Sequence, residues 1–141
     1  MSPKIPPPPA VSPSPVLVDS CWYIRGMRLG RDPMQELKQI ARVRDLATCG
    51  IVRSEVARGL REPKLLKAFQ ARWDVMLYVP TDNSLWSDVE ALAWRLDRAG
   101  HNLPLTDIVI ACCALRIGAV VLTHDRHFSL IPGIQTAEQI V

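Results

Sequence analysis

The chain has 141 residues, of which 48% are hydrophobic and 22% are charged. This length suits one domain, and this balance of apolar and charged side chains is typical of a folded globular protein rather than a disordered chain. The formal net charge of +3 is too small to demonstrate nucleic-acid binding, and the excess of 13 Arg over 4 Lys fits codon bias as well as it fits phosphate recognition.

The first 15 residues contain seven prolines and one charged side chain. Because proline fixes φ and lacks an N–H, this segment predicts a disordered, extended tail, and the folded domain is expected over residues 16–141. The prolines also interrupt the apolar stretch that a secretory signal needs. The longest apolar run, residues 108–115, is shorter than the ~20 residues that cross a bilayer. We therefore expect a cytoplasmic protein without a membrane span.

Short apolar runs along the rest of the chain predict strands that are buried on both faces, at residues 16–18, 75–79 and 119–122. Helical patterns lie between them. Asp32 and Pro33 begin one helix, because Asp caps a helix and proline fits its first turn. A second helix starts near Pro63, and a third is expected from Leu85 to Ala99, where apolar residues recur at spacings of four and three. This alternation predicts an α/β fold, with a mainly parallel sheet between two layers of helices.

Four acidic residues lie beside these apolar segments. Asp19 and Asp125 each follow a predicted strand, Glu55 follows the apolar residues 50–52 at an expected helix start, and Asp107 opens the apolar run. Ligands gather at the carboxyl ends of strands in such sheets, although each acid alone could merely cap a helix or turn. Four converging carboxylates would repel one another and need a cation, and Mg²⁺ prefers oxygen ligands.

Cysteine and histidine give weaker signals. No CxxC spacing occurs, so reduced, buried thiols are expected rather than a zinc or redox site at Cys21, Cys49, Cys112 and Cys113. His124 and His127 could ligate a softer metal, but flanking residues on a surface turn are more often solvated.

The segments VLVDS, SEVARG, LPLTDIVIACCAL and VLTHDRHFSLIPGI, in this order, resemble the signature segments of PIN-domain nucleases over about residues 16–136. The resemblance is closest to the VapC-like toxins of toxin–antitoxin pairs, which share the chain's length, a Glu followed shortly by Gly59, and the turn at Phe128. It implies a PIN-like three-layer α/β/α sandwich and an endoribonuclease that uses Mg²⁺ or Mn²⁺ to cut RNA. A cognate antitoxin protein and a homodimer are implied as partners.

The same resemblance assigns roles by position. The implied metal ligands are Asp19, Asp107 and Asp125. Glu55 is implied as the further catalytic acid, which binds a metal-coordinated water or orients the attacking one. Thr123 is expected to touch a metal-bound water or a phosphate, and Arg25 could steer phosphate inward or simply be solvated. His127 stands where some relatives carry an acid, which leaves the fourth acidic role to Asp125.

Two alternatives stay open. Asp19 at a strand end also suits an aspartyl-phosphate enzyme, either a haloacid-dehalogenase-like phosphatase or a receiver domain. The phosphatase would need a second Asp where Cys21 stands, and the receiver needs a Lys after a late strand, whereas no Lys follows Lys67. The second alternative is a catalytically silent PIN-like module that binds RNA or a protein, and the intact set of four acids counts against it.

Overall fold

The computed structural model describes residues 13–140. Most of the predicted proline-rich tail lies outside this range. The last residues of that segment are already attached to the domain, because Arg44 Nε donates to the Ser14 carbonyl oxygen at 2.7 Å and the Val120 N–H donates to the Pro15 carbonyl oxygen at 2.9 Å. The chain therefore enters its first strand along a path that two hydrogen bonds define.

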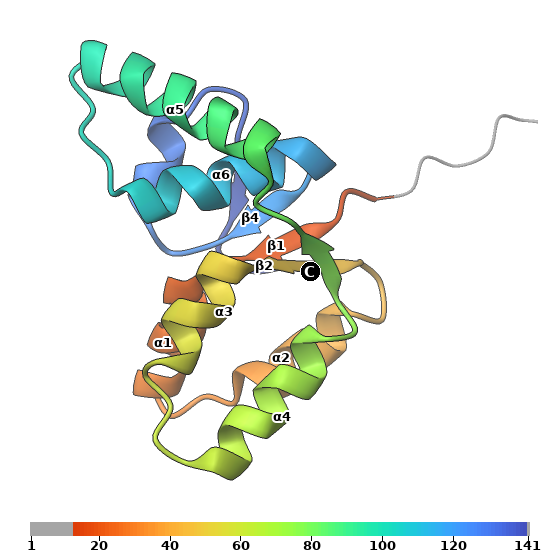
Figure 1. Cartoon of the computed structure of the whole chain (residues 1–141). Helices are drawn as coiled ribbons and strands as arrows, with labels where there is room; N and C mark the ends of the chain where they lie inside the picture. Colours follow the sequence, from red (N-terminus) through yellow and green to blue (C-terminus); the bar gives the residue numbers. More distant parts are fainter. Residues whose placement is uncertain (1–12, 141) are drawn as a thin grey trace, which may run out of the picture.

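Five parallel strands form one sheet in the order β3-β2-β1-β4-β5 (Figure 1). Their bounds are β1 Val16–Val18, β2 Leu46–Cys49, β3 Leu77–Val79, β4 Val120–Leu122 and β5 Gln135–Ala137. The chain builds the sheet outward from β1 to β3 and then returns to add β4 on the other side of β1. This reversal between β1 and β4 is where ligands bind in open parallel sheets.

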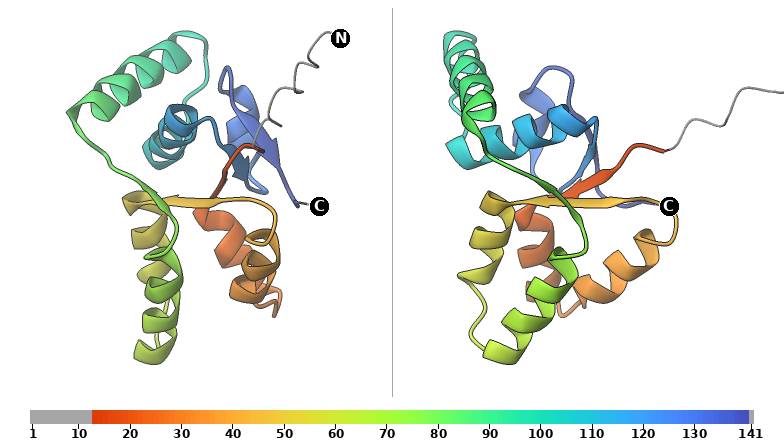
Figure 2. Two further views of the ribbon diagram at one scale, coloured as in Figure 1. Left: turned by 90° about the vertical axis from the view of Figure 1, so that its right-hand side faces the viewer. Right: turned by 45° about the vertical axis from the view of Figure 1, so that its right-hand side comes forward.

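Helices cover both faces of the sheet, which confirms the predicted three-layer α/β/α fold (Figures 1 and 2). One layer contains α1 Ser20–Arg28, α2 Pro33–Ile40, α3 Gly50–Ala57 and α4 Pro63–Trp73. The other contains α5 Asn83–Arg98 and α6 Leu105–Ile117, and a short 3-10 helix, η1 Arg126–Leu130, follows β4. Within residues 13–140, no helix combines the length and the apolar character that a membrane span requires.

Local side-chain chemistry sets the helix starts. Asp32 accepts hydrogen bonds from the Met34 and Gln35 N–H groups at 3.1 and 3.3 Å, as the sequence predicts for a capped helix. Asp82 accepts from the Leu85 N–H at 2.9 Å, so α5 begins at Asn83, two residues earlier than expected. Capping therefore decides the boundary where the apolar spacing alone does not.

The strand predictions need three corrections. The strand expected at residues 75–79 begins only at Leu77, and Leu77 and Tyr78 are 47% and 53% exposed rather than buried. The physical reason is position, since β3 forms one edge of the sheet. Strands β2 and β5 were not predicted, because their sequences LATC and QTA lack a run of large apolar residues.

An aromatic cluster fastens α1 to α4 below the sheet. Tyr23, Phe69 and Trp73 are all at most 2% exposed, with ring centroids 5.5 to 6.1 Å apart. Trp73 Nε1 donates a hydrogen bond to the Tyr23 hydroxyl at 3.2 Å, so both polar groups are satisfied inside the core. This packing holds the first turn of α1, which carries part of the candidate site, against the sheet.

Candidate active site

The four predicted acids come from four separate segments. Asp19 is the residue between β1 and α1, and Asp125 lies between β4 and η1. Because Val18 pairs with Leu122 in the parallel sheet, the chain leaves β1 and β4 side by side. Asp107 is in the first turn of α6. Glu55 lies well inside α3 rather than at a helix start, because residues 50–52 form the first turn of that helix and not a strand.

Thr123 joins Asp19 to Asp125. Its Oγ1 donates to Asp19 Oδ2 at 2.8 Å and accepts from the Asp125 N–H at 2.9 Å. Thr123 is only 3% exposed, so its hydroxyl is committed to fixing the two acids relative to each other. The expectation that Thr123 touches a substrate phosphate stays a prediction.

Ser20 links Glu55 to the same cluster. Ser20 Oγ donates to Glu55 Oε1 at 2.9 Å and lies 3.5 Å from Asp19 Oδ1. Ser20 is 7% exposed and is the first residue of α1, so the turn that ends β1 also sets the position of Glu55. Sequence analysis did not assign this role, because the partner of Ser20 is 35 residues away in the chain.

Cys21 contacts Asp19 from the other side. Its Sγ lies 2.7 Å from Asp19 Oδ2 and 3.3 Å from Thr123 Oγ1. Burial, together with the charge of Asp19, raises the pKa of the Cys21 thiol to about 12. Cys21 therefore stays protonated and donates to Asp19, which excludes it as a thiolate nucleophile. All four cysteines are free, and the other three are buried, as expected.

His127 joins the last two acids, which corrects the expectation that it is merely solvated. His127 Nδ1 lies 2.9 Å from Asp107 Oδ2 and 3.2 Å from Asp125 Oδ1, and the His127 N–H donates to Asp125 Oδ1 at 2.9 Å. The expectation failed because η1 turns the side chain back toward α6, whereas a residue on an open turn would face water. Among residues 13–140, donor atoms of Asp107, Asp125 and His127 all lie within 4.8 Å of one another.

The carboxylates of the cluster oppose one another's ionisation. Burial raises the pKa of Asp19 above its ordinary value, and the charge of Asp125 acts in the same direction. Burial also raises the pKa of Asp107 to about 6, with contributions from the charges of Asp125 and Asp19, while the hydrogen bond with His127 opposes the rise. A bound cation would relieve this repulsion, and hard divalent ions such as Mg²⁺ match carboxylate donors.

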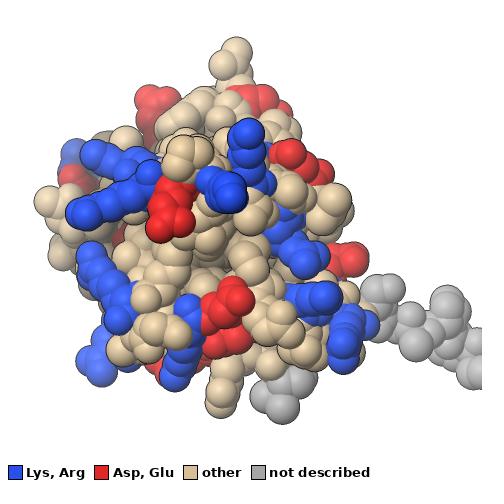
Figure 3. Space-filling model, turned by 90° about the horizontal axis from the view of Figure 1, so that it is seen from below, with Lys and Arg blue, Asp and Glu red and all other residues tan. Residues whose placement is uncertain are grey.

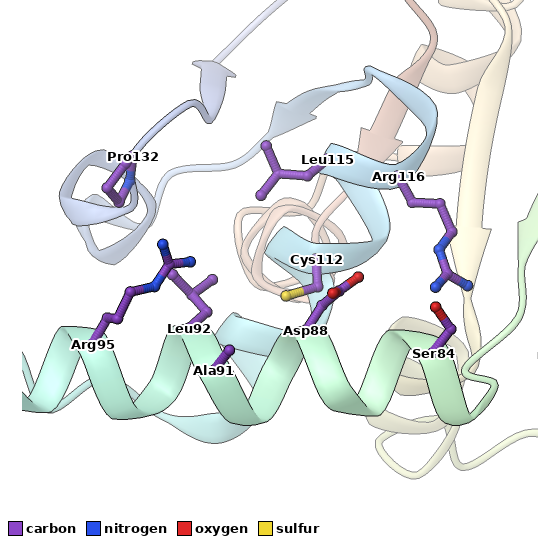
Figure 4. A pocket seen from close by; sticks show the side chains of 9 residues that line it. All are labelled: Ser84, Asp88, Ala91, Leu92, Arg95, Cys112, Leu115, Arg116 and Pro132. Atoms are coloured by element: carbon purple, nitrogen blue, oxygen red, sulfur yellow. The ribbon is translucent and has the colours of Figure 1, made fainter.

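The site opens into a hollow of about 500 Å³. Its lining residues are Cys21, Arg25, His124, Asp125, Arg126 and His127. Arg25 therefore shares a cavity with one of the acids. A second hollow of about 560 Å³ lies between α5 and α6, and Figure 4 shows Arg95, Arg116 and Asp88 around it. None of the four acids lines that second hollow, whereas Asp125 lines the one at Arg25.

The family comparison agrees with this geometry. The model of the PIN-domain family matches residues 16–134. The chain belongs to the PIN-domain family. PIN domains are nucleases, and the carboxylate cluster at the β1–β4 reversal supplies the acidic groups expected of such an enzyme. A search of curated proteins finds no match to the chain.

Several solved structures share the fold at low sequence identity. DNA-bound VapBC from Salmonella typhimurium has a TM-score of 0.71 and 21% identity, over 88% of this chain and 97% of that one. VapBC2 from Rickettsia felis, bound to a promoter DNA fragment, has a TM-score of 0.70 and 16% identity, over 86% and 96%. VapC20 from Mycobacterium tuberculosis, a toxin that cleaves the sarcin-ricin loop, has a TM-score of 0.60 and 14% identity, over 81% and 92%.

Proposed function

We propose that this PIN domain is a metal-dependent endoribonuclease that hydrolyses RNA phosphodiester bonds and acts in the cytoplasm as the toxin of a toxin–antitoxin pair. One observation carries the proposal. Four acidic side chains from four separate segments meet at one edge of the sheet, linked by hydrogen bonds through Ser20, Thr123 and His127. A set of structural caps would have no reason to converge in this way.

The donor set fits Mg²⁺ or Mn²⁺, because it consists mainly of carboxylate oxygens. Asp19, Asp107 and Asp125 would hold the cation, which when bound neutralises phosphate oxygens and acidifies a coordinated water. Glu55 would orient the attacking water and accept its proton, while Ser20 Oγ, which donates to Glu55 Oε1 at 2.9 Å, holds the Glu55 carboxylate at the cluster. No covalent intermediate on the protein is needed.

The surface charges support a polyanionic substrate. The end of α3, the α3–α4 connection and the start of α4 expose Arg58, Arg61, Lys64 and Lys67 against the single acid Glu62. Figure 3 views the molecule from the side of the α1–α4 layer and shows basic side chains interspersed with acidic ones on that face. Arg25 adds a guanidinium to the lining of the hollow that Asp125 also lines. Such groups bind backbone phosphates without reading sequence.

The structural neighbours support the partners that we propose. One neighbour is a toxin–antitoxin complex from Klebsiella pneumoniae, and VapC20 is a toxin that cleaves the sarcin-ricin loop. We therefore expect RNA as the substrate, an antitoxin protein that covers the hollow lined by Arg25 and Asp125, and a homodimer of this chain.

The direct test is RNA cleavage by the purified full-length protein. We expect single-stranded RNA to be cut in Mg²⁺ or Mn²⁺, and the rate to fall by more than about 100-fold in EDTA and to return when Mg²⁺ is added in excess. Cleavage that continues undiminished in chelator would exclude a metal mechanism. Tight RNA binding without cleavage under any metal condition would favour the catalytically silent module instead.

A second prediction concerns Arg25. Arg25→Ala should raise KM for a short single-stranded RNA by about 5- to 10-fold with little change in kcat, because an exposed guanidinium holds phosphate through an interaction of about 1 kcal/mol. The matched control is Arg28→Ala, on the same helix but outside the lining of the hollow. If both variants raise KM equally, the effect reflects general charge, and Arg25 has no specific role.

A further inference from the structure

His127 presents a nitrogen donor to two carboxylates that come from different elements. Asp107 belongs to α6, whereas Asp125 precedes η1 and His127 is inside it. The side chains of Asp107 and Asp125 are 13% and 28% exposed, and that of His127 is 45% exposed. The imidazole therefore sits at the solvent side of the acids, with Nδ1 directed at both of them rather than at water.

The spacing of these three donors suits an ion. Bonds of about 2.1 Å to an octahedral cation place neighbouring donor atoms about 3 Å apart. His127 Nδ1 lies 2.9 Å from Asp107 Oδ2 and 3.2 Å from Asp125 Oδ1, so it has that spacing from each carboxylate, and donor atoms of all three residues lie within 4.8 Å of one another. An ion bound to the three atoms would replace the contacts between His127 and the two carboxylates.

Resting on the function proposed above, we propose that His127 is itself a metal ligand through Nδ1. Asp107, Asp125 and His127 then form a mixed oxygen and nitrogen site that favours Mn²⁺ over Mg²⁺. Carboxylate and water suit Mg²⁺, whereas imidazole suits first-row transition ions. A neutral imidazole also adds no negative charge, so it contributes less than a carboxylate to attraction for the hard Mg²⁺ ion.

The local fold keeps His127 in this position. The His127 N–H donates to Asp125 Oδ1 at 2.9 Å, which locks the start of η1 onto the second ligand. The next residue, Phe128, is 0% exposed and anchors the turn in the core. A ligand that is already oriented loses little conformational entropy on binding, so the geometry favours direct coordination over displacement of the ring.

Two measurements on the full-length protein, stripped of metal and then loaded with MnCl₂ or MgCl₂, test this assignment. By calorimetry, we expect His127→Ala to weaken Mn²⁺ binding by at least about 10-fold and Mg²⁺ binding by less than about 3-fold. His127→Asp should strengthen Mg²⁺ binding. By pulsed electron paramagnetic resonance, bound Mn²⁺ should show coupling to a nitrogen nucleus, and His127→Ala should abolish that coupling.

His124→Ala is the matched control, because His124 lines the same hollow but lies outside the group of three donors. It should keep the nitrogen coupling and the Mn²⁺ affinity. Melting curves in EDTA identify any variant that does not fold, and absence of the coupling in the unaltered protein overturns the assignment without a variant.

The outcomes separate this inference from the proposed function. If Mn²⁺ binds without nitrogen coupling, or if His127→Ala changes Mn²⁺ and Mg²⁺ affinity equally, His127 only pairs with Asp107. The inference is then wrong, while metal-dependent cleavage stands. If the unaltered protein binds neither ion and cuts RNA in EDTA, the proposed function itself fails.

Discussion

Asp19→Asn is expected to lower the rate of RNA cleavage by more than about 100-fold while leaving the metal-free fold at least as stable as the unaltered protein. Asp19 is 1% exposed, and its Oδ2 accepts hydrogen bonds from Thr123 Oγ1 at 2.8 Å and from Cys21 Sγ at 2.7 Å. The carbonyl oxygen of Asn can accept both bonds, and its NH2 can donate to Ser20 Oγ where Asp19 Oδ1 accepts, so the substitution mainly removes the charge.

The stability half of this prediction follows from the pKa of Asp19. Burial raises it above the ordinary value, and the charge of Asp125 adds to the rise. When folding raises the pKa of a carboxyl, the free energy of unfolding is highest below the unfolded-state pKa. It declines as pH rises through that pKa and stays lowered above the folded-state pKa. At pH 7 without metal, the unaltered protein bears this penalty and Asp19→Asn does not.

Melting curves at pH 7, in EDTA and in millimolar Mg²⁺, check the predicted stability, and an RNA cleavage assay checks the predicted loss of activity. Mg²⁺ should raise the Tm of the unaltered protein, because an ion that binds only the folded state stabilises it, and should barely move that of Asp19→Asn. Asp97→Asn is the control, since Asp97 is exposed on α5. A variant that melts far below the unaltered protein in EDTA, with an equal response to Mg²⁺, would show that Asp19 is a structural residue.

The sequence predicts the sheet edge of the site well, for a physical reason. Asp19 directly follows one apolar strand, and Asp125 follows another after two residues. Parallel strands of one sheet end at the same edge, so the neighbourhood of the two acids follows from local pattern plus one topological rule. What the pattern could not supply is that β1 and β4 are adjacent. Pairing of Val18 with Leu122 is a long-range choice, made by packing rather than by any residue near either strand.

Glu55 shows where local pattern misleads. Residues 50–52 are more apolar than β2, and a helix start was expected at Glu55 just beyond them, yet these residues are themselves the first turn of α3 and Glu55 lies further along the helix. Strand β2 is fully buried although only Leu46 among its four residues is large and apolar, because it lies between β1 and β3 inside the sheet. Burial in the middle of a sheet comes from tertiary position and overrides the weak β-propensity of Ala47.

His127 was not predictable as a site residue, because its contact with Asp107 depends on the return of the chain to the start of α6. The hydrogen bond of its N–H to Asp125 is local, but the contact with Asp107 spans 20 residues and requires η1 to face the start of α6. A histidine two residues after an acid carries no spacing signal of its own. The general lesson is that the acids were found from chain pattern, whereas the groups that connect them needed the fold.

Asp107→Asn is expected to lower cleavage by more than about 100-fold and to remove much of the pH dependence of stability that the metal-free protein should show between pH 4 and 7. Burial raises the pKa of Asp107 to about 6, against about 3.9 for an unfolded Asp. Below pH ~4 the Asp107 carboxyl is protonated in both the folded and the unfolded protein, so its burial does not lower the free energy of unfolding. As pH rises toward 6, the unfolded chain ionises first, so stability falls, and above about 6 the loss is complete.

His127 acts with the same sign. Its hydrogen bond with Asp107 raises the pKa of His127, so the stability that this pairing contributes is present below the unfolded value and is lost as pH rises through the folded one. In Asp107→Asn the contribution of Asp107 vanishes, and that of His127 shrinks to the part that Asp125 supplies. His127 is 45% exposed, so solvent screens part of its interaction with Asp107. As pH rises from 4 to 7, the free energy of unfolding of Asp107→Asn should therefore rise by about 1 to 2 kcal/mol relative to that of the unaltered protein.

Urea unfolding in EDTA at several pH values measures this difference, with Asp97→Asn again as the control. Mg²⁺ should reverse the fall of the free energy of unfolding with rising pH, because the ion binds the deprotonated carboxylate. Its stabilising effect should therefore be small at pH 5, larger at pH 7, and largely absent in Asp107→Asn. If Asp107→Asn and the unaltered protein keep parallel stability curves from pH 4 to 7, the carboxyl of Asp107 does not titrate near 6. The repulsion that makes a cation favourable at this site would then be absent.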